Sequence, residues 1–142
     1  MAARFLAFFL LFLATCTANA QDSALGDSDR AAIRDVIGKQ VEAFRRDDGD
    51  AAFGLASPDI QHMFGTSETF MDMVRRAYQP VYRPRAFDFG NIVYLNGQPT
   101  QKVRVVGPDG RRVNAFYAMT RLPDGTWRID GCFLQAPDEH QA

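Results

Sequence analysis

The sequence predicts an α+β domain in which N-terminal helices pack on one face of an antiparallel meander sheet. Up to Pro80 the apolar residues recur with a helical period, and beyond it they recur with the period of two that is typical of strands. Gly-rich and Asp-rich turn signals separate the strand-like segments. Because short connections make neighbouring strands antiparallel, we expect a meander.

Composition indicates one folded domain and argues against a nucleic-acid-binding protein. The 142 residues are 46% apolar and include 12 Phe, which is too apolar for a disordered chain. The 16 Lys and Arg are balanced by 17 Asp and Glu, giving a formal charge of −1. Nucleic acids and anionic membranes are bound by basic surfaces, so neither is an expected partner.

The first twenty residues are typical of a secretory signal peptide. Arg4 precedes an unbroken apolar run at 5–14, and Ala18-Asn19-Ala20 has the small residues of a cleavage site. The run is shorter than the ~20 residues that cross a bilayer, so we expect no stable membrane insertion after cleavage. We therefore expect cleavage after Ala20 and a secreted, periplasmic protein. The alternative is a lipid anchor at Cys16.

Residues 21–28 and 136–142 carry no periodic pattern, and we expect them to be flexible ends around a single domain at 29–135. Removal of the signal peptide would take Cys16 away and leave Cys132 with no partner for an internal disulfide. Because Cys132 lies in a strand-like segment, we expect a small buried hydrophobe rather than a reactive thiol.

Three helices are predicted ahead of the sheet. The first covers 29–46, where five apolar residues share one face: Ile33, Val36, Ile37, Val41 and Phe44. A shorter helix is predicted at 51–57, with Pro58 ending it, and a third at 67–78. Four strands follow, at 86–95, 99–106, 111–121 and 126–135.

Loop lengths predict which strand residues share a face of the sheet. Four-residue loops at 107–110 and 122–125 would place one set on the core face: Val103, Val105, Phe116, Ala118, Thr120, Trp127, Ile129 and Phe133. The outer face would then carry Arg104, Val113, Tyr117, Met119, Asp130, Cys132 and Leu134. Such a face is too apolar to be an ordinary solvent-exposed face. We therefore predict a homodimer through the outer sheet face; the alternative is that the C-terminal tail covers this face.

Four segments carry a family resemblance: Gln40-Val41-Glu42-Ala43-Phe44, Ala56-Ser57-Pro58, the stretch 78–85, and Trp127-Arg128-Ile129-Asp130-Gly131-Cys132. With them, Ile33 to Leu134 resembles the secreted bacterial domain-of-unknown-function 4864 family. The element order also resembles the superfamily of nuclear transport factor 2, ketosteroid isomerase and polyketide cyclases. That resemblance implies a cone-shaped, cystatin-like fold with a pocket between helices and a curved sheet. It implies no single reaction, because some members catalyse, many only bind and many are dimers.

Four polar residues are candidate ligand-binding residues: Gln40, Tyr78, Asp88 and Asn114. Gln40 falls at the centre of the first helix's apolar face, where a buried amide needs a partner. That partner is either a ligand or the protein backbone. The resemblance places Gln40 where ketosteroid isomerase has its oxyanion-stabilising tyrosine. We expect Asp88, Asn114 and Thr120 on the inner face of the sheet, where they would form a polar cluster with Gln40 and Tyr78. Asp88 lies there only if no bulge shifts the register set by the Asn96-Gly97 turn.

The same resemblance places the isomerase's general base at Phe64 or Met63, neither of which accepts a proton. His62 is near this position but shifted. The sequence has no H-E-x-x-H or C-x-x-C motif and no Gly-rich phosphate loop, so we expect no metal and no cofactor.

These observations favour an exported domain of unassigned activity that binds a small molecule or a protein partner without catalysis. One alternative is a cofactor-independent lyase, isomerase or hydrolase that uses Gln40 with Asp88 or His62. Another is a homodimeric assembly module of the cell envelope.

Overall fold

The computed structural model describes residues 25–137. The expected signal peptide, its cleavage site, Cys16 and most of the expected C-terminal tail lie outside the described residues. Helices precede strands, as predicted. The helices are α1 (Asp27–Arg45), α2 (Gly49–Gly54), α3 (Pro58–Phe64), α4 (Ser67–Ala77) and α5 (Gln79–Tyr82). The strands are β1 (Ala86–Leu95), β2 (Gln98–Val106), β3 (Arg112–Arg121) and β4 (Trp127–Gln135).

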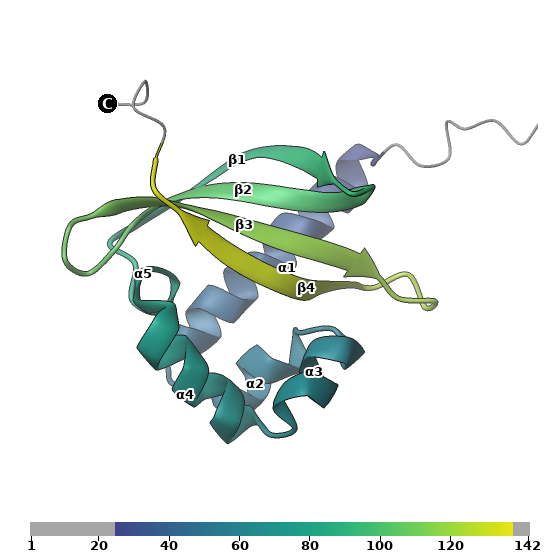
Figure 1. The fold of residues 1–142 in the computed structure, drawn as a ribbon. Helices are drawn as coiled ribbons and strands as arrows, with labels where there is room; N and C mark the ends of the chain where they lie inside the picture. Colours follow the sequence, from purple (N-terminus) through teal and green to yellow (C-terminus); the bar gives the residue numbers. More distant parts are fainter. Residues whose placement is uncertain (1–24, 138–142) are drawn as a thin grey trace, which may run out of the picture.

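The predicted α+β class is confirmed. The strands form one antiparallel sheet in the order β1-β2-β3-β4, with the strand bounds within one residue of those predicted. Figure 1 shows the helices on one side of the sheet, with α1 running across the strands and α3 and α4 facing β4. No helix in the described part of the chain is long and apolar enough to span a bilayer.

The long helix α1 forms where its apolar stripe is predicted. Ile33, Ile37 and Phe44 are each at most 2% exposed and pack against the sheet in the main core. Acidic residues occupy the first turn, where they complement the positive end of the helix dipole. The helix ends at Arg45, close to the predicted end, and Asp47 then takes a positive φ of 52°.

Two short helices were not predicted, and each has a proline in its first turn. Pro58 was predicted to end a helix at 51–57, but α2 already ends at Gly54, and Pro58 instead begins α3. The Ser57 side chain caps α3 by accepting the Ile60 N–H at 3.3 Å. Pro80 lies in the first turn of α5 in the same way. Proline fits the first turn of a helix because its missing N–H has no partner there in any case.

The loops on either side of β3 decide which of its side chains face the helices. Val106 pairs with Arg112 and Arg121 pairs with Trp127, so each loop spans five residues rather than the four expected. A shift of one residue in register moves every side chain of a strand to the other face. β3 therefore presents to the helices the set of side chains opposite to the predicted one.

The face prediction for β3 is wrong in consequence. Its buried apolar residues, each at most 1% exposed, are Ala115, Tyr117 and Met119. They share the helix side with Val103 and Val105 of β2, which were placed correctly. Phe116, Ala118 and Thr120 lie on the outer face.

A bulge in β4 changes its alternation as well. Ala118 pairs with Gly131 whereas Met119 pairs with Ile129, which leaves Asp130 as an extra residue. Trp127 and Ile129 face the helices before the bulge, as predicted.

Beyond the bulge the alternation is reversed. Cys132 and Leu134 pack against the core, whereas Phe133 is 39% exposed and stacks on Phe116 outside, with ring centroids 4.9 Å apart. The predicted dimer surface is thereby corrected, because Tyr117, Met119, Cys132 and Leu134 belong to the helix side.

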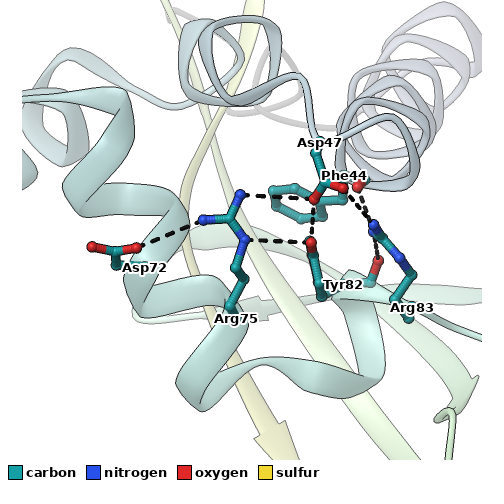
Figure 2. Close-up of polar contacts among 6 residues, drawn as sticks. All are labelled: Phe44, Asp47, Asp72, Arg75, Tyr82 and Arg83. Atoms are coloured by element: carbon teal, nitrogen blue, oxygen red, sulfur yellow. Dashed lines mark hydrogen bonds and ion pairs between the residues drawn. The ribbon is translucent and has the colours of Figure 1, made fainter.

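Figure 2 shows a polar cluster that joins three helices at the end of α1. The Asp47 carboxylate accepts hydrogen bonds from the Tyr82 hydroxyl and, at 2.9 Å, from the Arg83 guanidinium. Arg75 of α4 lies 3.7 Å from the same carboxylate and donates to the Tyr82 hydroxyl at 3.3 Å. Arg83 also donates to the Phe44 carbonyl at the end of α1. The cluster therefore links α1 to α4 and α5.

We expect the Asp47 cluster to make folding stability depend on pH. The hydrogen bond from Tyr82, together with Arg83 and Arg75, lowers the pKa of Asp47 below its ordinary value of 3.8, despite the opposing effect of desolvation. A group with a depressed pKa stabilises the folded state above its unfolded pKa, and this contribution is lost as the pH falls through the folded pKa. Asp47→Asn should therefore lower the urea midpoint at pH 7 and flatten its decline below about pH 4.

Asp35→Asn is the matched control for this measurement. Asp35 is exposed and pairs with Lys39 at 2.7 Å within α1, so its loss disconnects no two elements. Asparagine tolerates the positive φ at position 47, so the substitution does not strain the backbone. If Asp47→Asn and wild type share one urea midpoint at pH 7 and one pH profile, the cluster does not link the helices.

Candidate functional site

A cavity of about 330 Å³ lies between the helices and the sheet. Its wall is formed by fifteen residues from the helices, the sheet and the segment that leads into α3: Gln40, Phe44, Ala56, Ile60, Met63, Phe64, Phe70, Met73, Val74, Tyr78, Val81, Tyr117, Ile129, Gly131 and Cys132. None of these side chains is charged. The wall residues that retain exposure include Ile60, Met63 and Met73, with Met63 72% exposed, so the cavity opens beside α3 and α4.

The β4 bulge shapes the sheet side of this cavity. Ser57, at the start of α3, donates its hydroxyl to one Asp130 oxygen at 2.7 Å, and Gln98 donates its amide to the other at 2.9 Å. The Ser57 N–H also donates to the Ile129 carbonyl at 2.8 Å. The bulge is thus joined to both α3 and β2, and it brings Ile129 and Cys132 to the same wall.

Gln40 lies where the sequence predicts, but its amide already has a partner in the protein. It is 4% exposed and lines the cavity, and its Nε2 donates to the Ala52 carbonyl at 3.2 Å. Of the two partners that the sequence left open, the structure favours the backbone. This contact ties α1 to α2 and takes up one of the two amide hydrogens.

Tyr78 lines the cavity at the end of α4. Its hydroxyl donates to the Cys132 carbonyl at 2.7 Å, which connects α4 to β4 across the cavity wall. Burial raises the pKa of Tyr78 above its ordinary value, so the hydroxyl stays protonated at neutral pH. The hydroxyl proton of Tyr78 is thus already donated to the Cys132 carbonyl.

Asp88 and Asn114 are not brought together with Gln40 and Tyr78. Both pair with Arg104 in the sheet register, on the face away from the helices. The predicted inner-face position of both is therefore wrong. A bulge in β1 between Phe89 and Ile92 turns Asp88 outward, where it is exposed. The register of β3 places Asn114 on the same outer side, where with Arg104 it borders a separate surface hollow.

Tyr117 is the cavity residue that sequence reasoning missed, because it was assigned to the outer face. It is 1% exposed, and the group beside its hydroxyl is the Cys132 thiol, a weak hydrogen-bond partner. Burial raises the pKa of Tyr117 well above its ordinary value, so the group is a neutral donor.

The cavity wall offers few groups for acid–base chemistry. His62 is exposed on α3 and does not line the cavity. The described residues contain no cluster of three His, Cys, Asp or Glu side chains that would hold a metal ion. Within the described wall, the polar side chains are Gln40, Tyr78, Tyr117 and Cys132. This arrangement suits the binding of an apolar molecule with few polar contacts.

The Cys132 thiol is expected to react slowly. Burial raises the pKa of Cys132 to about 12, and only the thiolate is a nucleophile. At pH 8 the alkylation of Cys132 by iodoacetamide should be on the order of 1,000-fold slower than that of an unperturbed cysteine, and it should accelerate with each pH unit. Mass spectrometry of the peptide that contains Cys132 measures the rate, with the same protein in urea as control. Equal rates in the folded and unfolded protein would contradict the raised pKa of Cys132, whose side chain is partly buried against the core.

The comparisons with known proteins identify a family and no individual relative. The family described as "Domain of unknown function (DUF4864)" matches residues 26–142. No curated protein and no solved structure matches the chain.

Proposed function

We propose that this chain, which belongs to the DUF4864 family of domains of unknown function, binds a small, mostly apolar molecule without catalysis. The observation that carries the proposal is the uncharged cavity between the helices and the sheet, at about 330 Å³. Ligand sites are typically concave, largely apolar and about 300–1,000 Å³ in volume. This cavity lies at the lower end of that range.

The cavity volume indicates the size of the molecule. An apolar cavity of roughly 150 Å³ holds benzene. The present cavity is about twice as large, which suits a molecule of two fused rings or an aliphatic compound of similar bulk. Naphthalene is therefore an appropriate probe.

The positions of the candidate bases favour binding over turnover. A general base must come within about 3 Å of the proton that it removes. Asp88 lies on the far face of the sheet, and His62 is exposed outside the cavity wall. The rival hypothesis of a lyase, isomerase or hydrolase would need Asp88 or His62 at the cavity wall beside Gln40. The Gln40 amide itself already donates to the Ala52 carbonyl.

Two further parts of the proposal rest on the sequence. The order of helices and meander supports the wider likeness to the superfamily of nuclear transport factor 2, in which such a pocket often binds a ligand. Export to the periplasm, with cleavage after Ala20, is supported by the apolar run and small residues within 1–20.

Filling the cavity should weaken ligand binding. Ile60 is a half-buried residue of the cavity wall on α3, so Ile60→Trp should weaken naphthalene binding at least about 10-fold in a calorimetric or fluorescence titration. Ile92→Trp is the matched control, because Ile92 is also half-buried against the core but does not line the cavity. Circular dichroism checks that both variants fold. Failure of wild type to bind naphthalene, or unchanged binding by Ile60→Trp, would contradict the proposal.

Homodimeric assembly is a second candidate function, and one observation favours it. Phe133 is 39% exposed and stacks on Phe116 on the face of the sheet away from the helices. A stacked aromatic pair on an exposed sheet face is a suitable centre for an interface. Light scattering should then find a dimer that Phe133→Asp converts to a monomer. A monomeric wild type would exclude this candidate.

A further inference from the structure

The polar side chains of the cavity wall are already engaged within the protein. The Tyr78 hydroxyl donates to the Cys132 carbonyl at 2.7 Å, and the Gln40 amide donates to the Ala52 carbonyl at 3.2 Å. The Tyr117 hydroxyl is enclosed beside the Cys132 thiol, a weak hydrogen-bond partner. Apart from the second amide hydrogen of Gln40, these groups leave little with which an enclosed polar group of a ligand could pair.

The wall of the cavity has a buried part and an exposed part. Phe44, Val74 and Ile129 are each at most 5% exposed, so the buried part is apolar and shielded from solvent. Met73 is half-buried and Met63 is 72% exposed, so the wall meets solvent beside α3 and α4. A polar group of a ligand keeps its hydration at this mouth, whereas it would lose that hydration against the buried part, which is costly.

We propose that the cavity takes the hydrocarbon chain of a single-chain amphiphile, such as a medium-chain alcohol or carboxylic acid, whose one polar group stays in water at the mouth beside Met63 and Met73. This inference rests on the proposed function, because it names the class of ligand for the same cavity. Since roughly 150 Å³ holds the six carbons of benzene, about 330 Å³ accepts roughly a dozen carbons. The flexible methionine side chains at the mouth can adapt to a chain that enters between them.

Ten-carbon probes that differ only in their polar ends test the inference by titration calorimetry. The alcohol 1-decanol has one hydroxyl, 1,10-decanediol has one at each end, and decanoate has one charged end. Wild type should bind 1-decanol at least about 5-fold more tightly than the diol, because one diol hydroxyl would be enclosed without a free partner. Decanoate should bind within about 5-fold of 1-decanol, because its charge stays in water at the mouth.

Substitutions at Met63 test where the polar group lies. Met63→Lys should raise the ratio of the decanoate affinity to the 1-decanol affinity about 2- to 5-fold, and Met63→Glu should lower it to a similar extent, since exposed charge pairs have about this effect. Using the ratio cancels the apolar contact that either substitution removes. Leu95→Lys is the matched control and should leave the ratio unchanged, because Leu95 is 42% exposed and lies outside the cavity wall.

A further probe distinguishes two sources of such a chain. Decanoyl lysophosphatidylcholine carries the ten-carbon chain on a large headgroup. Its binding as tightly as decanoate would support a membrane lipid as the source, and its exclusion together with tight binding of decanoate would support a free acid or alcohol.

The outcomes separate this inference from the proposed function. If neither naphthalene nor any ten-carbon probe binds, the proposed function fails and this inference fails with it. If naphthalene binds and 1-decanol does not, the cavity binds ligands but not amphiphiles. Equal affinities for 1-decanol and the diol would overturn the inference, because a wall group such as Gln40 would then pair with an enclosed hydroxyl. A ratio that ignores the charge at position 63 would overturn the placement of the polar group at the mouth.

Discussion

The bulge at Asp130 is the constraint on which the candidate site depends. It lets β4 present Ile129 and Cys132 to the same cavity wall, although a regular strand would turn one of them away. Hydrogen bonds from Ser57 and Gln98 occupy both oxygens of the Asp130 carboxylate, so the bulge is held from α3 and from β2. The Asp130 side chain of β4 thus couples Ser57, which caps α3, to Gln98 of β2.

Local rules predicted most of the fold. The helical stripe of α1 and the four strands follow from apolar periodicity and turn residues, because each pattern acts over only a few residues. Gln40 was also placed correctly, since its position depends only on helical geometry. The helices α3 and α5 were missed because a proline that stops one helix also suits the first turn of the next.

The site was harder to predict because it depends on register. The two loops that flank β3 share the pattern Pro-Asp-Gly, and in each the glycine has a positive φ, 81° at Gly110 and 88° at Gly125. Such turns favour an odd number of loop residues, and this signal was available in the sequence. The bulges in β1 and β4 have a weaker local signal, a glycine inside each strand, Gly90 and Gly131. The Asp130 bulge also depends on Ser57, which is 73 residues away along the chain. Tyr117 and Asp88 were therefore assigned to the wrong faces.

Methionine methyl NMR tests the central claim most directly, because the described methionines divide into two groups. Met63 and Met73 line the cavity, whereas Met71 and Met119 do not. With ¹³C-methyl methionine and saturating naphthalene, ring currents should shift the signals of Met63 and Met73 and leave those of Met71 and Met119 nearly unmoved. Unchanged spectra, or equal shifts for all four methyl groups, would contradict a ligand-binding cavity between the helices and the sheet.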